Sequence, residues 1–213
     1  MDIEDFTESD VEMKRIYPLL IKETPEGLGY KEYNIQTKAS LKKILIDKGS
    51  SQKLYYPDFA ITVSGVPSII IEAKKPNEDL DEAYRQACLY ANELNREYPS
   101  KINPCELVIA SDGKFIYAGN IDTNKPDFKI PYSNWLSTDV DFDKFLKLFN
   151  HNELEIKAEK IKNKLRTEAK FKNPINLLGG KKIRNLESSN SFGENISIQY
   201  RHLFNPNIEN EKK

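Results

Sequence analysis

The chain has 213 residues, of which 38% are hydrophobic and 31% charged, and its formal net charge is −1. This length fits one domain with an appendage, and 11 Tyr and 10 Phe add enough apolar surface for a packed core. No apolar run approaches the ~20 residues that a membrane helix needs, and the acidic start Met-Asp-Ile-Glu-Asp is the opposite of a secretory signal.

The N-terminal part of the chain predicts a helix followed by strands. Apolar residues recur at helical spacing over residues 9–22, and Pro18 is expected to kink this helix or to end its regular part. A loop over residues 23–29 follows. Short apolar runs bounded by polar turns then predict strands at 34–39, 42–46, 54–63 and 67–73. The last two strands are expected to form a hairpin through Ser64-Gly65.

The next part predicts a helix, a second hairpin and a short closing helix. A stripe of alanine, leucine and tyrosine indicates a helix over residues 79–95. Strands at 107–111 and 114–118 flank Asp112-Gly113, a pair that supplies the positive φ angles of a tight turn. A short helix is expected over 141–149. Strands surrounded by helices at this spacing predict an α/β fold, a mixed central β-sheet flanked by helices.

The composition changes after residue 150. A basic helix with an apolar face is expected to end near residue 172, and the polar stretch beyond it reads as a linker. We therefore assign 1–150 to one domain and 151–213 to a basic helical C-terminal extension that leads to a missing or partner domain. Residues 157–184 contain 10 Lys/Arg and 2 Glu. This block predicts either a solvated helix that docks its apolar face on the core or a surface that follows phosphates.

Charged residues gather around the first hairpin. Pro57-Asp58 precedes it, and the apolar strand after it ends in Ile71-Glu72-Ala73-Lys74. Because side chains alternate along a strand, Glu72 and Lys74 point to the same side, roughly 6.5–7 Å apart along the backbone. Asp58 begins the preceding strand, so the hairpin places it beside the end of the next one. Two carboxylates and one ammonium group at one end of a sheet can hold a divalent metal and activate water.

Cysteine and histidine are scarce. The two cysteines, Cys88 and Cys105, lack CxxC spacing, so neither a disulfide framework nor a zinc site is indicated, and a protein of the reducing cytoplasm is expected. The two histidines, His151 and His202, lie near or in the C-terminal part. Carboxylates are therefore the expected metal ligands.

The pattern Pro57-Asp58…Glu72-Ala73-Lys74 resembles the PD-(D/E)xK nuclease signature. The longer pattern YYPDF…IIIEAKKP…AYRQACLYA is similar to the N-terminal nuclease domain of type I restriction enzyme R subunits and to related modules of bacterial defence proteins. The resemblance covers roughly residues 5–125. It implies a restriction-endonuclease-like fold, Mg²⁺ (with Mn²⁺ as a substitute) bound by Asp58 and Glu72, and a Lys74 that orients or activates the attacking water.

The resemblance also implies further site residues. Gln86 and Tyr90 match a Gln-x-x-x-Tyr element in which the glutamine binds the DNA backbone or a metal-bound water and the tyrosine steadies it. Glu12 stands where the preceding helix supplies another acid. Other roles suit the same residues: Tyr90 fits core packing, Ser9-x-x-Glu12 fits a capping box, and Lys74 fits a strand-end lysine that reaches solvent.

The sequence therefore predicts a Mg²⁺-dependent endonuclease that hydrolyses DNA as the module of a type I restriction-like or other bacterial defence system. The alternative is a catalytically inactive nuclease-fold module that binds DNA or docks a partner subunit. RNA or branched DNA stays open as substrate. R subunits carry an ATP-driven motor, whereas Gly179-Gly180-Lys181-Lys182 lacks the glycine spacing and the Ser/Thr of a phosphate loop. A motor and a specificity component are expected on a longer parent chain or on separate subunits.

Overall fold

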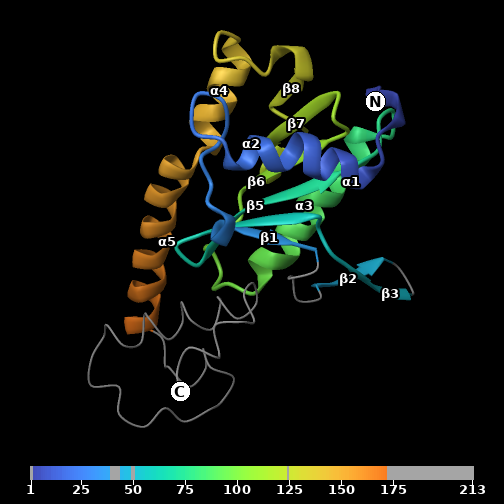
Figure 1. The fold of residues 1–213 in the computed structure, drawn as a ribbon. Helices are drawn as coiled ribbons and strands as arrows, with labels where there is room; N and C mark the ends of the chain where they lie inside the picture. Colours follow the sequence, from blue (N-terminus) through green and yellow to red (C-terminus); the bar gives the residue numbers. More distant parts are fainter. Residues whose placement is uncertain (1, 39–43, 49–50, 124, 172–213) are drawn as a thin grey trace, which may run out of the picture.

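The computed structural model describes residues 2–38, 44–48, 51–123 and 125–171. Within them, a central sheet has the strand order β1-β4-β5-β6-β7-β8. Its strands are β1 (Ile35–Thr37), β4 (Phe59–Val63), β5 (Val66–Ala73), β6 (Leu107–Ser111), β7 (Phe115–Asn120) and β8 (Phe128–Pro131). Strands β5 and β6 run parallel and the other neighbours run antiparallel. The predicted fold class, a mixed sheet flanked by helices, is confirmed (Figure 1).

Helices cover both faces of this sheet (Figure 1). Helices α1 (Glu8–Val11), α2 (Tyr17–Ile21), α4 (Val140–Phe149) and α5 (His151–Phe171) pack on one face, and α3 (Leu80–Arg96) packs on the other. The side chains of β5 alternate between the two cores: Ile69 and Ile71 join the first, and Ile70 joins the second. Every residue of β5 is buried, as expected for a strand covered on both faces.

The helix predicted over residues 9–22 is divided into segments. After η1 (Ile3–Asp5) and α1, a π-helical turn η2 (Glu12–Ile16) leads into α2. The Tyr17 amide donates to the Glu12 carbonyl, five residues back, and Pro18 follows directly. Because proline has no N–H and its ring crowds the preceding turn, a wider turn suits this position. The irregularity expected at Pro18 is therefore a local change of helix type.

The prediction of one strand over residues 54–63 is wrong. The structure has two strands there, β3 (Ser51–Tyr55) and β4, and β3 pairs with β2 (Ile44–Lys48) in a separate two-stranded sheet. Pro57 lies in the break, and a proline cannot donate to a strand ladder. Asp58 consequently lies immediately before β4 rather than inside a continuous strand.

Both predicted hairpins are confirmed, with different turns. Ser64 and Gly65 have φ angles of 51° and 79°, so both central residues of the first turn are left-handed, as a tight turn requires. In the second turn Gly113 has a φ of 80°, whereas Asp112 does not share the positive φ predicted for the pair. The Asp112 carboxylate instead accepts hydrogen bonds from the two amides that follow Gly113.

The helices predicted over residues 79–95 and 141–149 are confirmed as α3 and α4. The side chains of Asp79 and Asp139 cap their first turns by accepting backbone hydrogen bonds. In the part of the chain that the structure describes, no helix combines the length and the apolar character needed to cross a membrane.

Helix α5 docks its apolar face on the domain. Leu154 and Ala158 are buried in the same core as β5, and Leu165 is buried with Tyr98 and Ile102 in a smaller cluster. The predicted docking of the apolar face of this helix is confirmed as far as Leu165. The predicted linker over the last 40 or so residues lies outside the described residues.

Candidate active site

The backbone of the neighbouring strand β5 holds Asp58 at the end of the sheet. Phe59 pairs with Ile71, which brings Asp58 to the end of β5. The Asp58 Oδ2 accepts a hydrogen bond from the Ala73 amide at 2.8 Å, and its Oδ1 accepts one from Lys38 Nζ at 2.9 Å. The Asp58 side chain is only 1% exposed. These bonds fix the position of a buried charge that would otherwise be costly.

Glu72 and Lys74 form the predicted acid–base pair. Lys74 Nζ lies 3.1 Å from Glu72 Oε1, and their side chains are 19% and 7% exposed. Burial, followed by the charge of Asp58, raises the pKa of Glu72 to about 7. Burial acts to lower the pKa of Lys74, but its attraction to Glu72 outweighs this and the pKa is raised. One partner therefore titrates near neutrality while the other stays positively charged.

The N-terminal helix adds two acids beside Asp58. One carboxylate oxygen from each of Glu8, Glu12 and Asp58 lies within 4.8 Å of the others. Burial raises the pKa of Glu12, and the negative charges of Asp58 and Glu8 raise it further. Carboxylates this close repel one another unless a cation lies between them. The three side chains therefore form a concentrated negative site.

The capping-box alternative for Glu12 is wrong. The helix is capped two residues before Ser9, by Thr7, whose hydroxyl accepts a hydrogen bond from the Asp10 amide at 3.2 Å. The Asp10 carboxylate in turn accepts from the Thr7 amide at 3.0 Å. Since this reciprocal pair satisfies the first turn, Glu12 is not needed there. Its carboxylate lies beside Asp58 instead.

Gln86 and Tyr90 both lie on α3, but in different surroundings. Gln86 is half-buried and donates a hydrogen bond to Glu82 at 3.4 Å. Tyr90 is 4% exposed and belongs to the core between α3 and the sheet. The packing role that the helical stripe indicates for Tyr90 thus agrees with its burial. The roles of both residues toward DNA remain predictions.

Sequence reasoning missed two residues of this cluster, Glu8 and Lys38. Glu8 lies four residues before Glu12, so the two acids share one helical face, and this spacing was a usable signal. Lys38 follows β1, whose Thr37 pairs with Phe59. That pairing places Lys38 beside Asp58, and it cannot be found without knowing the strand register.

The donor set fits a hard divalent cation. Mg²⁺ takes oxygen ligands, usually one or two carboxylates completed by water and substrate phosphate. Of the two predicted ligands, Asp58 belongs to the three-carboxylate group and Glu72 does not. Among the residues that the structure describes, however, Glu72 Oε2 is buried without a hydrogen-bond partner. A cation at this end of the sheet would offset the cost of that unpaired oxygen.

The fold and the motif can be compared with known proteins. Residues 43–127 match the family model of the type I restriction enzyme R protein N terminus. The resemblance to this family is confirmed. The match includes five of the six predicted site residues, namely Asp58, Glu72, Lys74, Gln86 and Tyr90, and leaves out Glu12. Searches of curated proteins and of solved structures gave no significant match.

The R-protein match covers β2 to β7 and α3, but it leaves out β1, β8 and part of the site. Helix α1 and the turn η2, which bring Glu8 and Glu12 to Asp58, precede the matched residues. Helices α4 and α5 follow them. The acids of the N-terminal helix are therefore known from the geometry of this structure rather than from the family match.

Proposed function

We propose that this protein is a Mg²⁺-dependent endonuclease that hydrolyses DNA phosphodiester bonds, as the nuclease module of a type I restriction-like or other bacterial defence system. The observation that carries the proposal is the meeting of Asp58 with the Glu72–Lys74 pair and with Glu12 at one end of the sheet. The R-protein match supports the class of module. We infer that DNA translocation and sequence recognition come from a longer parent chain or from separate subunits.

Each side chain has a distinct task in this proposal. Asp58 and Glu72, with Glu12 beside them, would hold Mg²⁺ or Mn²⁺, and the ion would polarise the scissile phosphate and lower the pKa of a water. The Lys74 ammonium, held by Glu72 at 3.1 Å, orients the attacking water and offsets the negative charge that develops on the phosphate. The hydrogen bond from the Ala73 amide holds the Asp58 carboxylate in a fixed orientation.

A plasmid-nicking assay tests the proposal. Purified protein, or its parent complex, is expected to nick DNA with Mg²⁺ or Mn²⁺ and to leave it intact with EDTA. Asp58→Ala, Glu72→Ala and Lys74→Ala should each lower the rate by about 100-fold or more, since loss of one stabilising electrostatic contact has effects of that order. Glu26→Ala is the control, because Glu26 is an exposed acid of the surface.

Two results would contradict the proposal. Activity that survives all three substitutions would show that another site cuts the DNA. Salt-dependent DNA binding without cleavage under any divalent metal, unaffected by Asp58→Ala, would instead favour the catalytically inactive module.

A further inference from the structure

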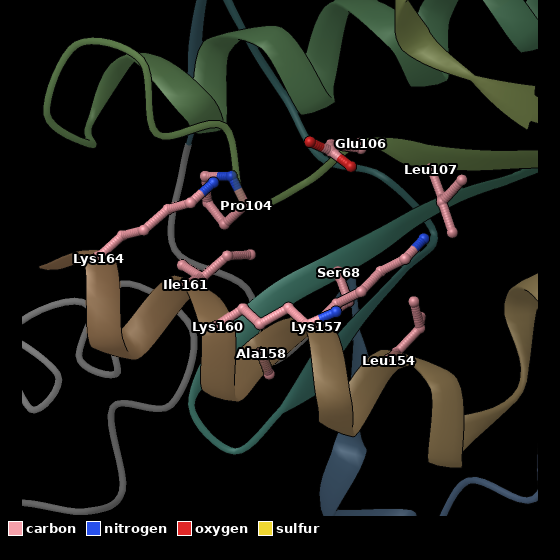
Figure 2. Close-up of a pocket in the computed structure, with 10 residues that line it drawn as sticks. All are labelled: Ser68, Pro104, Glu106, Leu107, Leu154, Lys157, Ala158, Lys160, Ile161 and Lys164. Atoms are coloured by element: carbon pink, nitrogen blue, oxygen red, sulfur yellow. The ribbon is translucent and has the colours of Figure 1, made fainter.

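Helix α5 carries lysines over a groove at the end of the sheet opposite the active site. Lys157, Lys160 and Lys164 line one side of a cavity of about 140 Å³, and the start of β5 and the segment before β6 line the other. Figure 2 shows Lys164 extending toward Pro104 and Lys157 extending toward Leu107. Leu107 begins β6, whereas Glu72 and Lys74 lie at the far end of the neighbouring strand β5, so the groove and the active site are separate.

The groove continues along the helix into a second, more open cavity. Lys160 and Lys164 also line this cavity, whose volume is about 570 Å³, together with Lys101 from the loop after α3. Ser100 and Asn163 add neutral hydrogen-bonding side chains to its wall. We call these two cavities, which share Lys160 and Lys164, the lysine groove.

The lysine groove carries an excess of positive charge. Within the described ranges, Lys157, Lys160 and Lys164 form no ion pair, whereas their neighbour Lys162 is held by Glu159 at 2.6 Å. Glu106 is the acid that lines the groove in the part of the chain the structure describes. Four lysines therefore face one carboxylate. Such a surface attracts a polyanion.

The spacing of the lysines suits a nucleic-acid backbone. Lys157, Lys160 and Lys164 are three and four residues apart, so they lie on one helical face. At 1.5 Å of rise per residue, the first and last are about 10 Å apart along the axis. Successive phosphates of one strand of duplex DNA advance about 3.4 Å along its axis, so this length spans roughly three phosphates.

We propose that the lysine groove binds the phosphate backbone of duplex DNA outside the cut site and retains the DNA without reading its sequence. The choice of DNA as the polyanion rests on the proposed nuclease function. From Ser68, which lines the groove, to Lys74 the chain advances six residues, or about 20 Å along an extended strand. A duplex in contact with both places therefore extends at least about six base pairs beyond the cut.

Binding of a duplex of about 30 base pairs in EDTA tests the groove separately from cleavage. We expect the triple variant K157Q/K160Q/K164Q to bind at least about tenfold more weakly than the unaltered protein near 0.1 M salt. The plot of log affinity against log salt should become less steep by up to about 3, because each lost phosphate contact removes a slope of about 0.9. Thermal melting should show that the variant remains folded.

The matched control is K22Q/K144Q/K147Q, which removes the same charge from exposed lysines that already pair with acids. We expect it to leave the salt slope close to that of the unaltered protein. An equal loss of slope in this control would show that net charge, and not the groove, sets DNA affinity.

The remaining outcomes separate the two proposals. Unchanged DNA binding by the groove variant, while the unaltered protein binds and nicks DNA, would overturn the groove and leave the nuclease standing. Unchanged DNA binding with loss of RNA binding would assign the groove to RNA and would also overturn it. An unaltered protein that neither binds nor nicks DNA would overturn both.

Discussion

Replacing Glu72 by glutamine is expected to change how the stability of the protein depends on pH. Glu72 is 5% exposed, and burial with the nearby charge of Asp58 raises its pKa to about 7, from an ordinary value of 4.5. The folded state therefore binds the Glu72 proton more tightly than the unfolded chain does. As pH rises from 4.5 to 7, the unfolded chain releases this proton first, so the free energy of unfolding falls.

The size of the effect follows from the two pKa values. A pKa of about 7 instead of 4.5 contributes about 3 kcal/mol to the free energy of unfolding at low pH. This contribution is lost progressively as pH rises through this range and is absent above it. Glutamine has the same shape and no charge to bury. The free energy of unfolding of Glu72→Gln, relative to that of the unaltered protein, should therefore rise by about 3 kcal/mol between pH 4.5 and pH 8. The lost contact with Lys74 adds a constant offset to this difference.

Urea unfolding in EDTA at four or five pH values measures this difference. Glu26→Gln, at an exposed carboxylate, controls for the loss of one negative charge. The reasoning would be refuted if the free energies of unfolding of Glu72→Gln and the unaltered protein differ by the same amount, within about 0.5 kcal/mol, from pH 5 to pH 8. If Glu72 is a metal ligand, Mg²⁺ should stabilise the unaltered protein more at pH 8 than at pH 5, because the cation and the proton compete for the carboxylate.

Three further predictions concern the metal site and the core. Glu12→Gln should weaken Mn²⁺ binding about tenfold in calorimetric titration, since it removes one candidate ligand and keeps its shape. Lys38→Gln should tighten Mn²⁺ binding, because its ammonium pairs with Asp58 and competes with the metal; unchanged affinity would contradict this. Asn95→Ala should lower the free energy of unfolding by about 1–3 kcal/mol, because Asn95 makes two buried hydrogen bonds to the Cys105 backbone.

The placement of Asp58 against β5 could be predicted because local signals agree. Ser64 and Gly65 form a turn of known geometry, and the strands on either side are apolar and short. Once the turn is fixed, antiparallel pairing brings the two strand ends together. The register shift between Ile61 and Thr62 did not disturb this, because it lies on the turn side of the site.

The start of the first helix could not be fixed from the sequence. Thr7 with Asp10 and Ser9 with Glu12 both have the spacing of a capping box, and the two alternatives differ by two residues. Only the first is used. The choice matters for function, because a helix capped at Ser9 would direct Glu12 back to its own backbone, whereas a cap at Thr7 leaves that carboxylate beside Asp58.

For Gln86 and Tyr90 on α3, the sequence alone could not distinguish a packing role from a functional one. Tyr90 falls in the buried stripe, and its burial agrees with packing. Gln86 lies one turn earlier on the half-exposed edge of the helix and bonds to Glu82. Residues four apart share a face in any helix, so this spacing alone does not decide whether the face meets the core or a ligand.

Charge balance is the physical argument that joins these features. The carboxylates of Glu8, Glu12, Asp58 and Glu72 interact with one another, and two ammonium groups, those of Lys38 and Lys74, lie among them. When all are ionised, the cluster has two uncompensated negative charges. The raised pKa values of Glu12 and Glu72 follow from burial and from this excess, and a bound divalent cation would balance it. A purely structural site would be more stable with fewer acids, so this excess of acids at one sheet end supports the proposal of metal-dependent chemistry.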